Sequence, residues 1–202
     1  VAIYVGSHAN FSEELTKAVD KFCATYDAVV FCDHTSGYRG KYEVHYQLVC
    51  AQEQWYSPLR RVDLCIHIGE VSGDQYMINS TETWRVSPDG ALRDTFGNLR
   101  RVFMMEEEAF FNKYAKEGFD YNDYYKDVCD DIDKVKNSIP ELPFSNIWMA
   151  QQMVDRLPKH CELHFGIYHS LRSWNFFKLP DGILAKCNVG GFGIDGGVST
   201  MI

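Results

Sequence analysis

The sequence has no long apolar run and few basic residues. Nowhere in its 202 residues do about eighteen apolar residues follow one another, so no segment is long enough to cross a bilayer as a helix. There are 20 lysines and arginines against 28 aspartates and glutamates, which gives a net charge of −8. This charge repels phosphate backbones and anionic lipids, so we expect neither nucleic acid nor an anionic membrane surface as a partner.

Paired cysteine motifs are also missing. The seven cysteines are scattered, their number is odd, and no two of them form C-x-x-C. Several lie in apolar runs, where cysteine behaves as a small hydrophobic residue, so we expect reduced thiols and a cytoplasmic protein. Three histidines lie near Cys161, but without the spacing of a ligand pair, and the sequence predicts no metal site. These histidines are His160, His164 and His169.

The glycine-rich stretch 188–202 matches neither common nucleotide-binding motif. Its glycines do not follow G-x-G-x-x-G from the end of a strand, and no Lys-Ser/Thr pair follows them. Glycines still let the backbone approach a ligand closely, although a tight crossover without a ligand is an equally good interpretation. The sequence also lacks an initiating Met and stops within an element, from which we expect a piece of a longer protein.

Apolar strands alternate with helical segments through the first part of the chain. This alternation predicts an α/β fold for residues 1–118, with a doubly wound and mostly parallel sheet of five or six strands. We expect helices from a cap at Asn10, over 42–54, as a short helix at 73–80, and over 106–114. The expected strands are Val1–Val5, Ala28–Cys32, Val62–Ile68, Glu82–Val86 and Arg100–Met104.

The composition changes after this region. Residues 119–143 predict an acidic connector with one polar helix near 121–137, and residues 144–202 predict an incomplete second α/β unit. In that unit Ser145 caps a helix, followed by a strand over 161–167, a loop over 168–174 and a strand over 183–187. Loops at the ends of neighbouring parallel strands share one crevice, which would bring Ser170 close to Ile194. The expected apolar face of the helix is Ile147, Ala150, Met153, Val154 and Leu157.

Two groups of motifs resemble one enzyme family. The later group is Gly166-Ile-Tyr-His-Ser-Leu171 with Asn188-x-Gly-x-x-Gly-Ile-Asp-Gly-x-x-Ser-Thr200. The earlier group is Val62-Asp-Leu-x-Ile-x-Ile-Gly69 with Trp84-x-Val-x-Pro-x-Gly-x-x-Arg-Asp94. Together they resemble 2-succinyl-5-enolpyruvyl-6-hydroxy-3-cyclohexene-1-carboxylate synthase, a thiamine-diphosphate enzyme of menaquinone biosynthesis. The resemblance extends over nearly the whole chain.

The resemblance implies a division of the chain and a reaction. Residues 1–118 would be the central, Rossmann-like domain, and residues 144–202 the start of the pyrophosphate-binding domain. The family decarboxylates 2-oxoglutarate and adds the four-carbon unit to isochorismate, with thiamine diphosphate and Mg²⁺ as cofactors and sites formed between subunits of a homo-oligomer. The activating glutamate and most metal ligands would lie outside this chain, so we expect no catalytic residue within it and no activity from it alone.

The resemblance also implies roles for single residues. Ile194 would hold the two rings of the cofactor in a V shape, the carbonyl of Phe192 would accept a hydrogen bond from its pyrimidine, and Gly193 would permit that approach. Ser170 would face the substrate. The chain departs from the family at Val189, Asp74 and Trp174, where relatives have residues that bind carboxylates. Arg172 is the nearest cation to Ser170 and is our candidate for that role.

Two other interpretations remain open. The chain could be a non-catalytic α/β nucleotide-binding module, or it could belong to another thiamine-diphosphate decarboxylase or carboligase. A catalytic glutamate upstream and a metal-binding motif downstream would separate the enzymes from the module.

Overall fold

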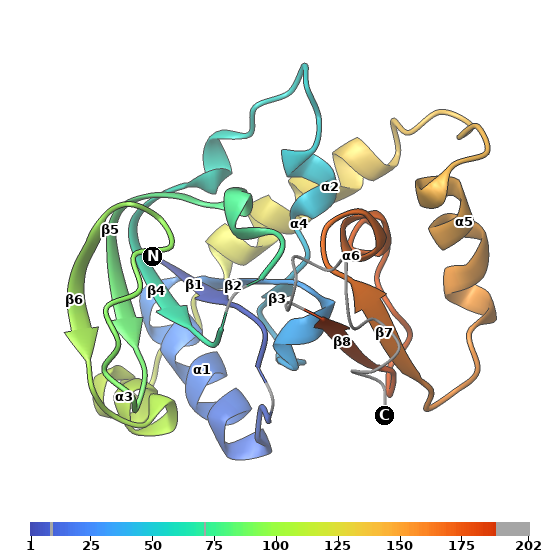
Figure 1. The fold of residues 1–202 in the computed structure, drawn as a ribbon. Helices are drawn as coiled ribbons and strands as arrows, with labels where there is room; N and C mark the ends of the chain where they lie inside the picture. Colours follow the sequence, from blue (N-terminus) through green and yellow to red (C-terminus); the bar gives the residue numbers. More distant parts are fainter. Residues whose placement is uncertain (9, 71, 189–202) are drawn as a thin grey trace.

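A six-stranded parallel sheet forms the larger part of the fold (Figure 1). The structure is a computed structural model and describes residues 1–8, 10–70 and 72–188. Neighbouring strands follow the order β3-β2-β1-β4-β5-β6, and each pair is parallel. The strands are β1 Ala2–Val5, β2 Val29–Cys32, β3 Glu43–Val44, β4 Arg61–Ile68, β5 Asn79–Val86 and β6 Leu99–Phe103.

Strand β1 lies at the point where the strand order reverses. The chain runs outward from β1 through β2 to β3, then returns to the other side of β1 with β4 and continues outward. Ala2 is paired with Val29 on one side and with Cys65 on the other, and all four residues of β1 are buried. Reversal of the order leaves a crevice at the carboxyl ends of β1 and β4, where open α/β sheets bind ligands.

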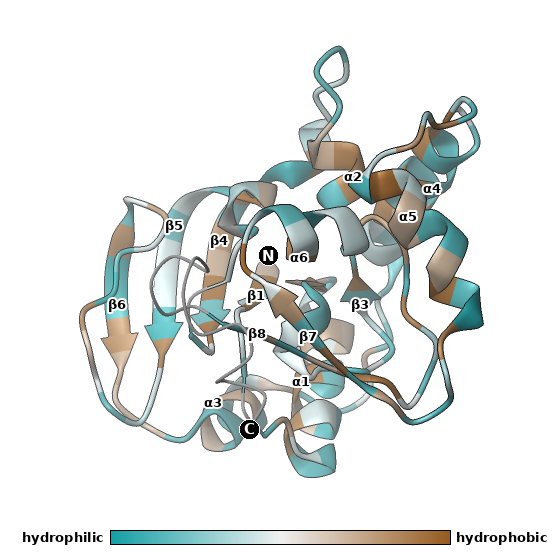
Figure 2. Ribbon diagram, turned by 45° about the vertical axis from the view of Figure 1, so that its right-hand side comes forward, coloured by the Kyte–Doolittle hydropathy of each residue, from teal (hydrophilic) through white to brown (hydrophobic). Residues whose placement is uncertain are grey.

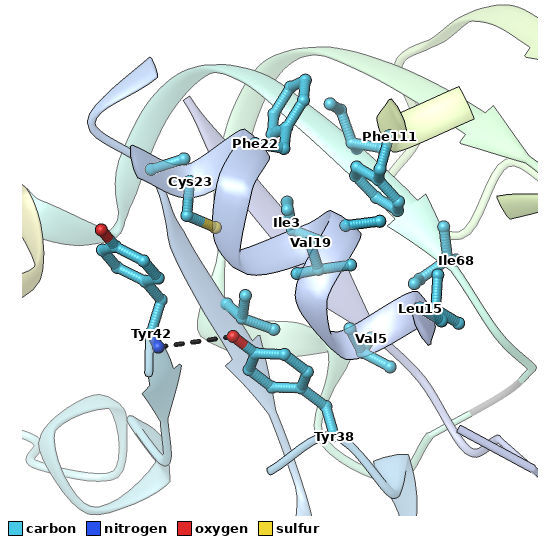
Figure 3. Packing of buried hydrophobic residues seen from close by; sticks show 14 of the residues in the cluster. Ile3, Val5, Leu15, Val19, Phe22, Cys23, Tyr38, Tyr42, Ile68 and Phe111 are labelled. Carbon is cyan, nitrogen blue, oxygen red and sulfur yellow. Dashed lines mark hydrogen bonds between the residues drawn. The ribbon is translucent and has the colours of Figure 1, made fainter. Parts of the chain in front are cut away.

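Helices cover both faces of this sheet. On one face α1 Glu13–Tyr26 and α3 Glu107–Tyr114 pack against the strands through aromatic and aliphatic side chains, including Phe22 and Phe111 (Figure 3). On the other face α2 Gln47–Cys50 and α4 Asp123–Lys136 complete a second core cluster. Apolar residues along β4 and β6 appear brown in Figure 2. The expected doubly wound parallel sheet is confirmed.

His67 of β4 is packed in the core. Its side chain is buried, and its ring contacts those of Tyr4 and Phe96 edge-on, with centroids 5.7 and 5.5 Å away. Burial, followed by the positive charge of Arg85, lowers the pKa of His67 to about 3. The imidazole is therefore neutral at physiological pH and serves as an aromatic packing group.

A smaller unit follows the large sheet. It consists of α5 Asn146–Met153, β7 Glu162–Gly166, α6 His169–Trp174 and β8 Leu184–Asn188. Strands β7 and β8 are parallel, with Gly166 opposite Asn188, so their carboxyl ends lie side by side. Four short 3-10 helices complete the described elements: η1 His34–Ser36, η2 Pro58–Arg60, η3 Gln75–Met77 and η4 Val154–Arg156. Within the described residues, no helix is both long and apolar enough to span a bilayer.

Two expectations for the first unit were wrong in detail. Helix α1 is capped by Ser12, whose side chain accepts a hydrogen bond from the Leu15 amide, and not by Asn10. Either residue suits a cap, so propensity alone did not decide between them. Residues 42–54 are mostly not helical, because Glu43 and Val44 pair with β2 as an edge strand and the helix covers only Gln47–Cys50.

The second unit also differs from the expectation at two places. Residues 169–174 form the helix α6 rather than a loop, after a turn in which Tyr168 has a φ of 73°. Ser145 does cap α5, and Ala150 and Val154 are buried as expected. Met153, expected on the apolar face, is 45% exposed. The buried residues Ala150 and Val154 are four positions apart and define the buried side, and Met153 lies next to that side rather than on it.

The polar helix predicted near 121–137 exists as α4, and it packs on the large sheet. Val128 and Val135 are its buried residues and belong to the second core cluster. Tyr124 donates a hydrogen bond from its hydroxyl to the carbonyl of Leu59, which fixes the start of the helix against the strand layer. The proposed domain division at residue 118 stays a prediction, but α4 is physically part of the first core.

Val128→Ala should destabilise the large sheet. The change removes two buried carbons and leaves a cavity beneath α4, at a cost of about 2 kcal/mol in the free energy of unfolding. Asp127→Ala on the exposed side of the same helix is the matched control and should change little. Denaturant unfolding of both variants measures the difference. Equal stability of the two would show that α4 does not contribute to this core.

Candidate functional site

Ser170 lies at the carboxyl edge of the β7–β8 pair. It is in the first turn of α6, directly after β7, and it is exposed. A Cβ placed on Gly166, the last residue of β7, would be 3.7 Å from its hydroxyl oxygen. The structure thus places this hydroxyl at the strand edge where the sequence indicated a crevice. Its proposed neighbour Ile194 lies outside the described residues, as do Val189, Phe192 and Gly193.

Arg172 of α6 contacts the loop that follows β4. Its Nε and Nη2 donate hydrogen bonds to the carbonyl of Gly73 at 3.2 and 3.0 Å, and its Nε lies 3.5 Å from Oδ1 of Asp74. The guanidinium also lies over the rings of Tyr168 and Tyr76. Arg172 therefore ties the second unit to the first, and its proposed contact with a substrate carboxylate stays a prediction.

Asp74 is buried at the same contact. Its Oδ2 accepts a hydrogen bond from the side-chain amide of Asn175, and its backbone amide donates to the hydroxyl of Ser72. Burial raises the pKa of Asp74 to about 6. The hydrogen bond from Asn175 and the charge of Arg172 act in the opposite direction, whereas the negative charge of Asp33 raises the pKa further. The carboxylate is held by its partners although its surroundings favour the neutral acid.

A second buried carboxylate, Asp33, follows directly after β2. Its Oδ1 accepts hydrogen bonds from the amide and the hydroxyl of Thr35 at 2.7 and 2.6 Å, and its Oδ2 accepts one from Ser72. Ser72 therefore links the carboxylate of Asp33 to the backbone amide of Asp74. The residue after Asp33, His34, forms hydrogen bonds with residues at and after the end of α6.

His34 connects the end of β2 to the end of α6. Its amide donates to Oδ1 of Asn175 at 3.3 Å, and its Nε2 lies 3.1 and 2.9 Å from the carbonyls of Trp174 and Phe177. Burial, followed by the charge of His45, lowers the pKa of His34, so the ring is neutral. Because carbonyls only accept, Nε2 carries the proton. We call the set Asp33, His34, Ser72, Asp74, Arg172 and Asn175 the junction cluster.

Trp174 has a packing role in this arrangement. Its ring lies 5.6 Å from that of Phe165 in β7, and its carbonyl is one of the two acceptors for His34. The resemblance placed a substrate-binding arginine at this position. The described contacts of Trp174 are those of a residue that fixes α6 against β7.

A cleft of about 980 Å³ lies between the two units. The carboxyl ends of β1 and β2 form one wall, through Ser7, His8 and His34, and β8 forms the other through Leu184–Cys187. This volume is at the upper end for small-molecule sites. The cleft lies at the topological switch point, a location where α/β sheets bind ligands. The turn after β1, however, does not have the sequence of a dinucleotide-binding motif.

Gly6 in that first turn has a structural use. A Cβ at this position would lie 1.9 Å from the carbonyl oxygen of Glu70, at the end of β4. The glycine therefore permits the backbones after β1 and β4 to approach each other. This close approach accounts for the glycine without any bound phosphate.

The junction cluster was only partly visible in the sequence. Asp33 and His34 directly follow the expected strand Ala28–Cys32, and that position was the available signal. Asn175 lies in no motif, and its partners His34 and Asp74 are 141 and 101 residues away along the chain. No local pattern could have assigned it.

The junction cluster should make stability depend on pH. The pKa of Asp74 is raised from 3.8 to about 6, so the folded protein keeps a proton that the unfolded chain loses within this window. The contribution of Asp74 to stability therefore falls by about 3 kcal/mol as the pH rises from below 4 to above 6. Asp74→Asn should remove this fall, so the variant gains on the wild type as the pH increases. Denaturant unfolding across this range measures it.

The control for that experiment is Asp63→Asn, which removes the same charge from an exposed position. If the two variants followed the same pH dependence, the raised pKa of Asp74 would be refuted. An Asp74→Asn variant that loses stability relative to the wild type as the pH increases would show that Arg172 and Asn175 outweigh burial.

Comparisons with known proteins give several related synthases. No family model matches the chain. It is 32% identical over 126 residues to the 2-succinyl-5-enolpyruvyl-6-hydroxy-3-cyclohexene-1-carboxylate synthase of Bacteroides fragilis, which covers 60% of this chain and 22% of that protein. The enzymes of the same name from Phocaeicola vulgatus and Flavobacterium johnsoniae are each 30% identical, over 125 and 114 residues. These matches cover 60% and 54% of this chain, and 22% and 21% of the two enzymes.

The chain thus matches about a fifth of the length of these curated relatives. The α/β fold with its six parallel strands agrees with the expected central domain of such an enzyme. The resemblance stated from the motifs is confirmed: this chain is related in sequence to a segment of the 2-succinyl-5-enolpyruvyl-6-hydroxy-3-cyclohexene-1-carboxylate synthases.

Proposed function

We propose that the chain is a segment of a thiamine-diphosphate-dependent synthase of menaquinone biosynthesis. The complete protein would decarboxylate 2-oxoglutarate and add the four-carbon unit to isochorismate. The observation that carries this proposal is the match, over more than half of the chain, to relatives that share one name. The full protein would act as a homo-oligomer in the cytoplasm.

Within that protein the chain has a supporting role. Residues 1–118 are the proposed central domain, residues 119–143 the connector, and residues 144–202 the start of the pyrophosphate-binding domain. The parallel pair β7–β8, with the exposed Ser170 at its carboxyl edge, supports this assignment. Ser170 would then contact substrate, and Phe192, Gly193 and Ile194 would contact the cofactor.

The described residues fit the cofactor only in part. The exposed hydroxyl of Ser170 lies at the end of β7 and the wide cleft is lined by β8, but the described residues offer no group of three metal ligands at that edge. The Mg²⁺ ligands would therefore come from other parts of the protein. When bound, thiamine diphosphate supplies the electron sink for decarboxylation and bond formation, and the protein supplies position and exclusion of water.

A nucleotide-binding module is the competing proposal, favoured by the cleft at the switch point. Gly6 in this cleft serves backbone packing. The glycine-rich stretch 188–202, which suggested a nucleotide in the sequence, lies outside the described residues after Asn188. A different thiamine-diphosphate carboligase is the third proposal, because substrate recognition would depend on residues beyond this chain.

The longer protein that contains this chain should consume 2-oxoglutarate and isochorismate, release CO₂ and require both thiamine diphosphate and a divalent cation. The 202-residue chain alone should show no tight magnesium-dependent binding of thiamine diphosphate by calorimetry. Product analysis of the complete protein tests the activity. Micromolar binding of thiamine diphosphate by the isolated chain would contradict the proposed partial site, and turnover of another 2-oxo acid alone would favour the other carboligase.

Arg172→Ala should separate a substrate contact from a purely structural one. If Arg172 also binds a substrate carboxylate, its loss should raise the KM for one dicarboxylate by the equivalent of about 1.5–3 kcal/mol, with unchanged cofactor affinity. Asp74→Asn is the matched control, because it removes the internal partner of Arg172 but keeps the guanidinium. Equal changes in KM for the two variants would assign Arg172 to the junction alone.

A further inference from the structure

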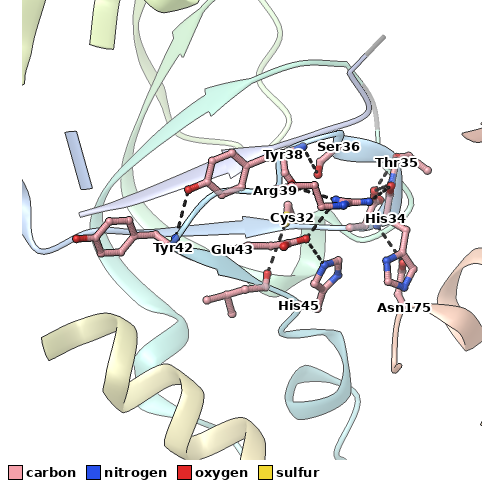
Figure 4. A network of polar contacts seen from close by, with 12 residues as sticks. Cys32, His34, Thr35, Ser36, Tyr38, Arg39, Tyr42, Glu43, His45 and Asn175 are labelled. Atoms are coloured by element: carbon pink, nitrogen blue, oxygen red, sulfur yellow. Dashed lines mark hydrogen bonds and ion pairs between the residues drawn. The ribbon is translucent and has the colours of Figure 1, made fainter. Parts of the chain in front are cut away.

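Three residues with metal-binding side chains meet at the edge of the large sheet. Cys32 ends β2, Glu43 belongs to the neighbouring strand β3, and His45 follows that strand (Figure 4). The thiol sulfur, a carboxylate oxygen and an imidazole nitrogen all lie within 4.8 Å of one another. Among the described residues, this is the one group that brings three such atoms together.

We propose that Cys32, Glu43 and His45 form a binding site for a divalent cation of the zinc type. A thiolate, an imidazole and a carboxylate are the ligand types of zinc, and ligands at about 2.0–2.3 Å from the ion lie less than 4 Å apart when tetrahedral. The proposal is independent of thiamine diphosphate, and it concerns the central sheet rather than the strand edge at Ser170.

The charges of the three ligands suit a divalent cation. Cys32 is fully buried, and in the metal-free site its thiol donates to the carbonyl of Val44, with sulfur and oxygen 3.8 Å apart. Metal binding would replace the S–H bond by an S–metal bond and release that proton. The resulting thiolate and the carboxylate together balance two positive charges. Proton release is therefore a direct signature of the proposed site.

One ring nitrogen of His45 has no hydrogen-bond partner in the metal-free site. Nε2 of His45 is bonded to Oε1 of Glu43 at 2.8 Å, while its Nδ1 is buried without a partner. Unpaired buried polar atoms are costly, so rotation of the ring onto a cation would relieve this cost. The imidazole of His34 lies beside it, with ring centroids 4.6 Å apart. A pocket of about 630 Å³ reaches Glu43 and His45 and gives the ion a route from solvent.

Arg39 is the competitor of the cation. Its Nη1 lies 3.2 Å from Oε1 of Glu43 and also donates to the carbonyl of Tyr38. The same oxygen of Glu43 is also bonded to Nε2 of His45, so the oxygen proposed to bind the ion already has two partners. A bound cation must either displace the guanidinium or be repelled by its positive charge. Removal of Arg39 should therefore strengthen metal binding.

Titration of the chelator-treated 202-residue chain with Co²⁺ tests the site. Co²⁺ reports its ligands through its absorption, and we expect intense visible bands of a tetrahedral ion with a thiolate-to-cobalt charge-transfer band in the near ultraviolet. Zn²⁺ should abolish these bands by displacement, with release of a proton that calorimetry in two buffers detects. A spectrum without the thiolate band, or only octahedral cobalt, would overturn the proposal.

Variants assign the ligands. Cys32→Ser should abolish the charge-transfer band. His45→Gln should weaken metal binding at least about tenfold, because loss of a residue that only hydrogen-bonds a ligand already weakens binding by about that factor. Cys65→Ser is the matched control, because Cys65 is equally buried in β4. Arg39→Gln should increase the affinity. If Cys32→Ser does not fold, His45→Gln and Arg39→Gln still test the site, and unchanged metal affinity in both variants would overturn the proposal. A loss of metal affinity in Cys65→Ser equal to that in the ligand variants would also overturn it.

Discussion

The buried carboxylate of Asp74 is the constraint on which the arrangement of the two units depends. It is removed from water in the loop after β4, and the contacts that the described residues make with it come from the Asn175 amide and the Arg172 guanidinium of the second unit. A buried carboxylate without partners costs far more than one hydrogen bond returns. The second unit therefore has to dock in the one orientation that brings the end of α6 to this loop.

Other contacts follow from that docking. Once Asn175 is in place, its Oδ1 faces the amide of His34, and the carbonyls at the end of α6 face the His34 ring. Gly73 packs where a side chain would begin to meet Ile167 and Leu171, at 3.5 Å from each. The β7–β8 edge with Ser170 is thereby fixed relative to the switch-point crevice.

The sequence predicted the parts of the fold that depend on local pattern. Continuous apolar runs such as Ala28–Cys32 identified buried parallel strands, because both faces of these strands are covered by helices. The two-residue strand β3 was missed, since its pairing with β2 is a tertiary contact and its neighbours suit a helix. That error also concealed the group of Cys32, Glu43 and His45, which forms only when β3 lies beside β2.

The candidate site was predicted less completely than the fold. Ser170 was placed correctly at a strand's carboxyl edge because the strand and its end are visible in the sequence. Arg172 was identified as a notable cation, but its bonds to Gly73 and Asp74 connect residues about a hundred positions apart, beyond the range of any periodicity. The cofactor contacts proposed at Phe192, Gly193 and Ile194 came from family resemblance and stay predictions.

Amide hydrogen exchange of Asn175→Ala tests the central role of the junction most directly. Asn175 is buried and bridges Asp74 to His34, so its truncation should leave the carboxylate without its amide donor and raise exchange in α6 and β7. Exchange in β1 and β2, which lie in the core of the large sheet, should stay near the wild-type rate. Uniformly increased exchange across both units, or unchanged exchange in α6, would contradict the account that this contact holds the second unit in place.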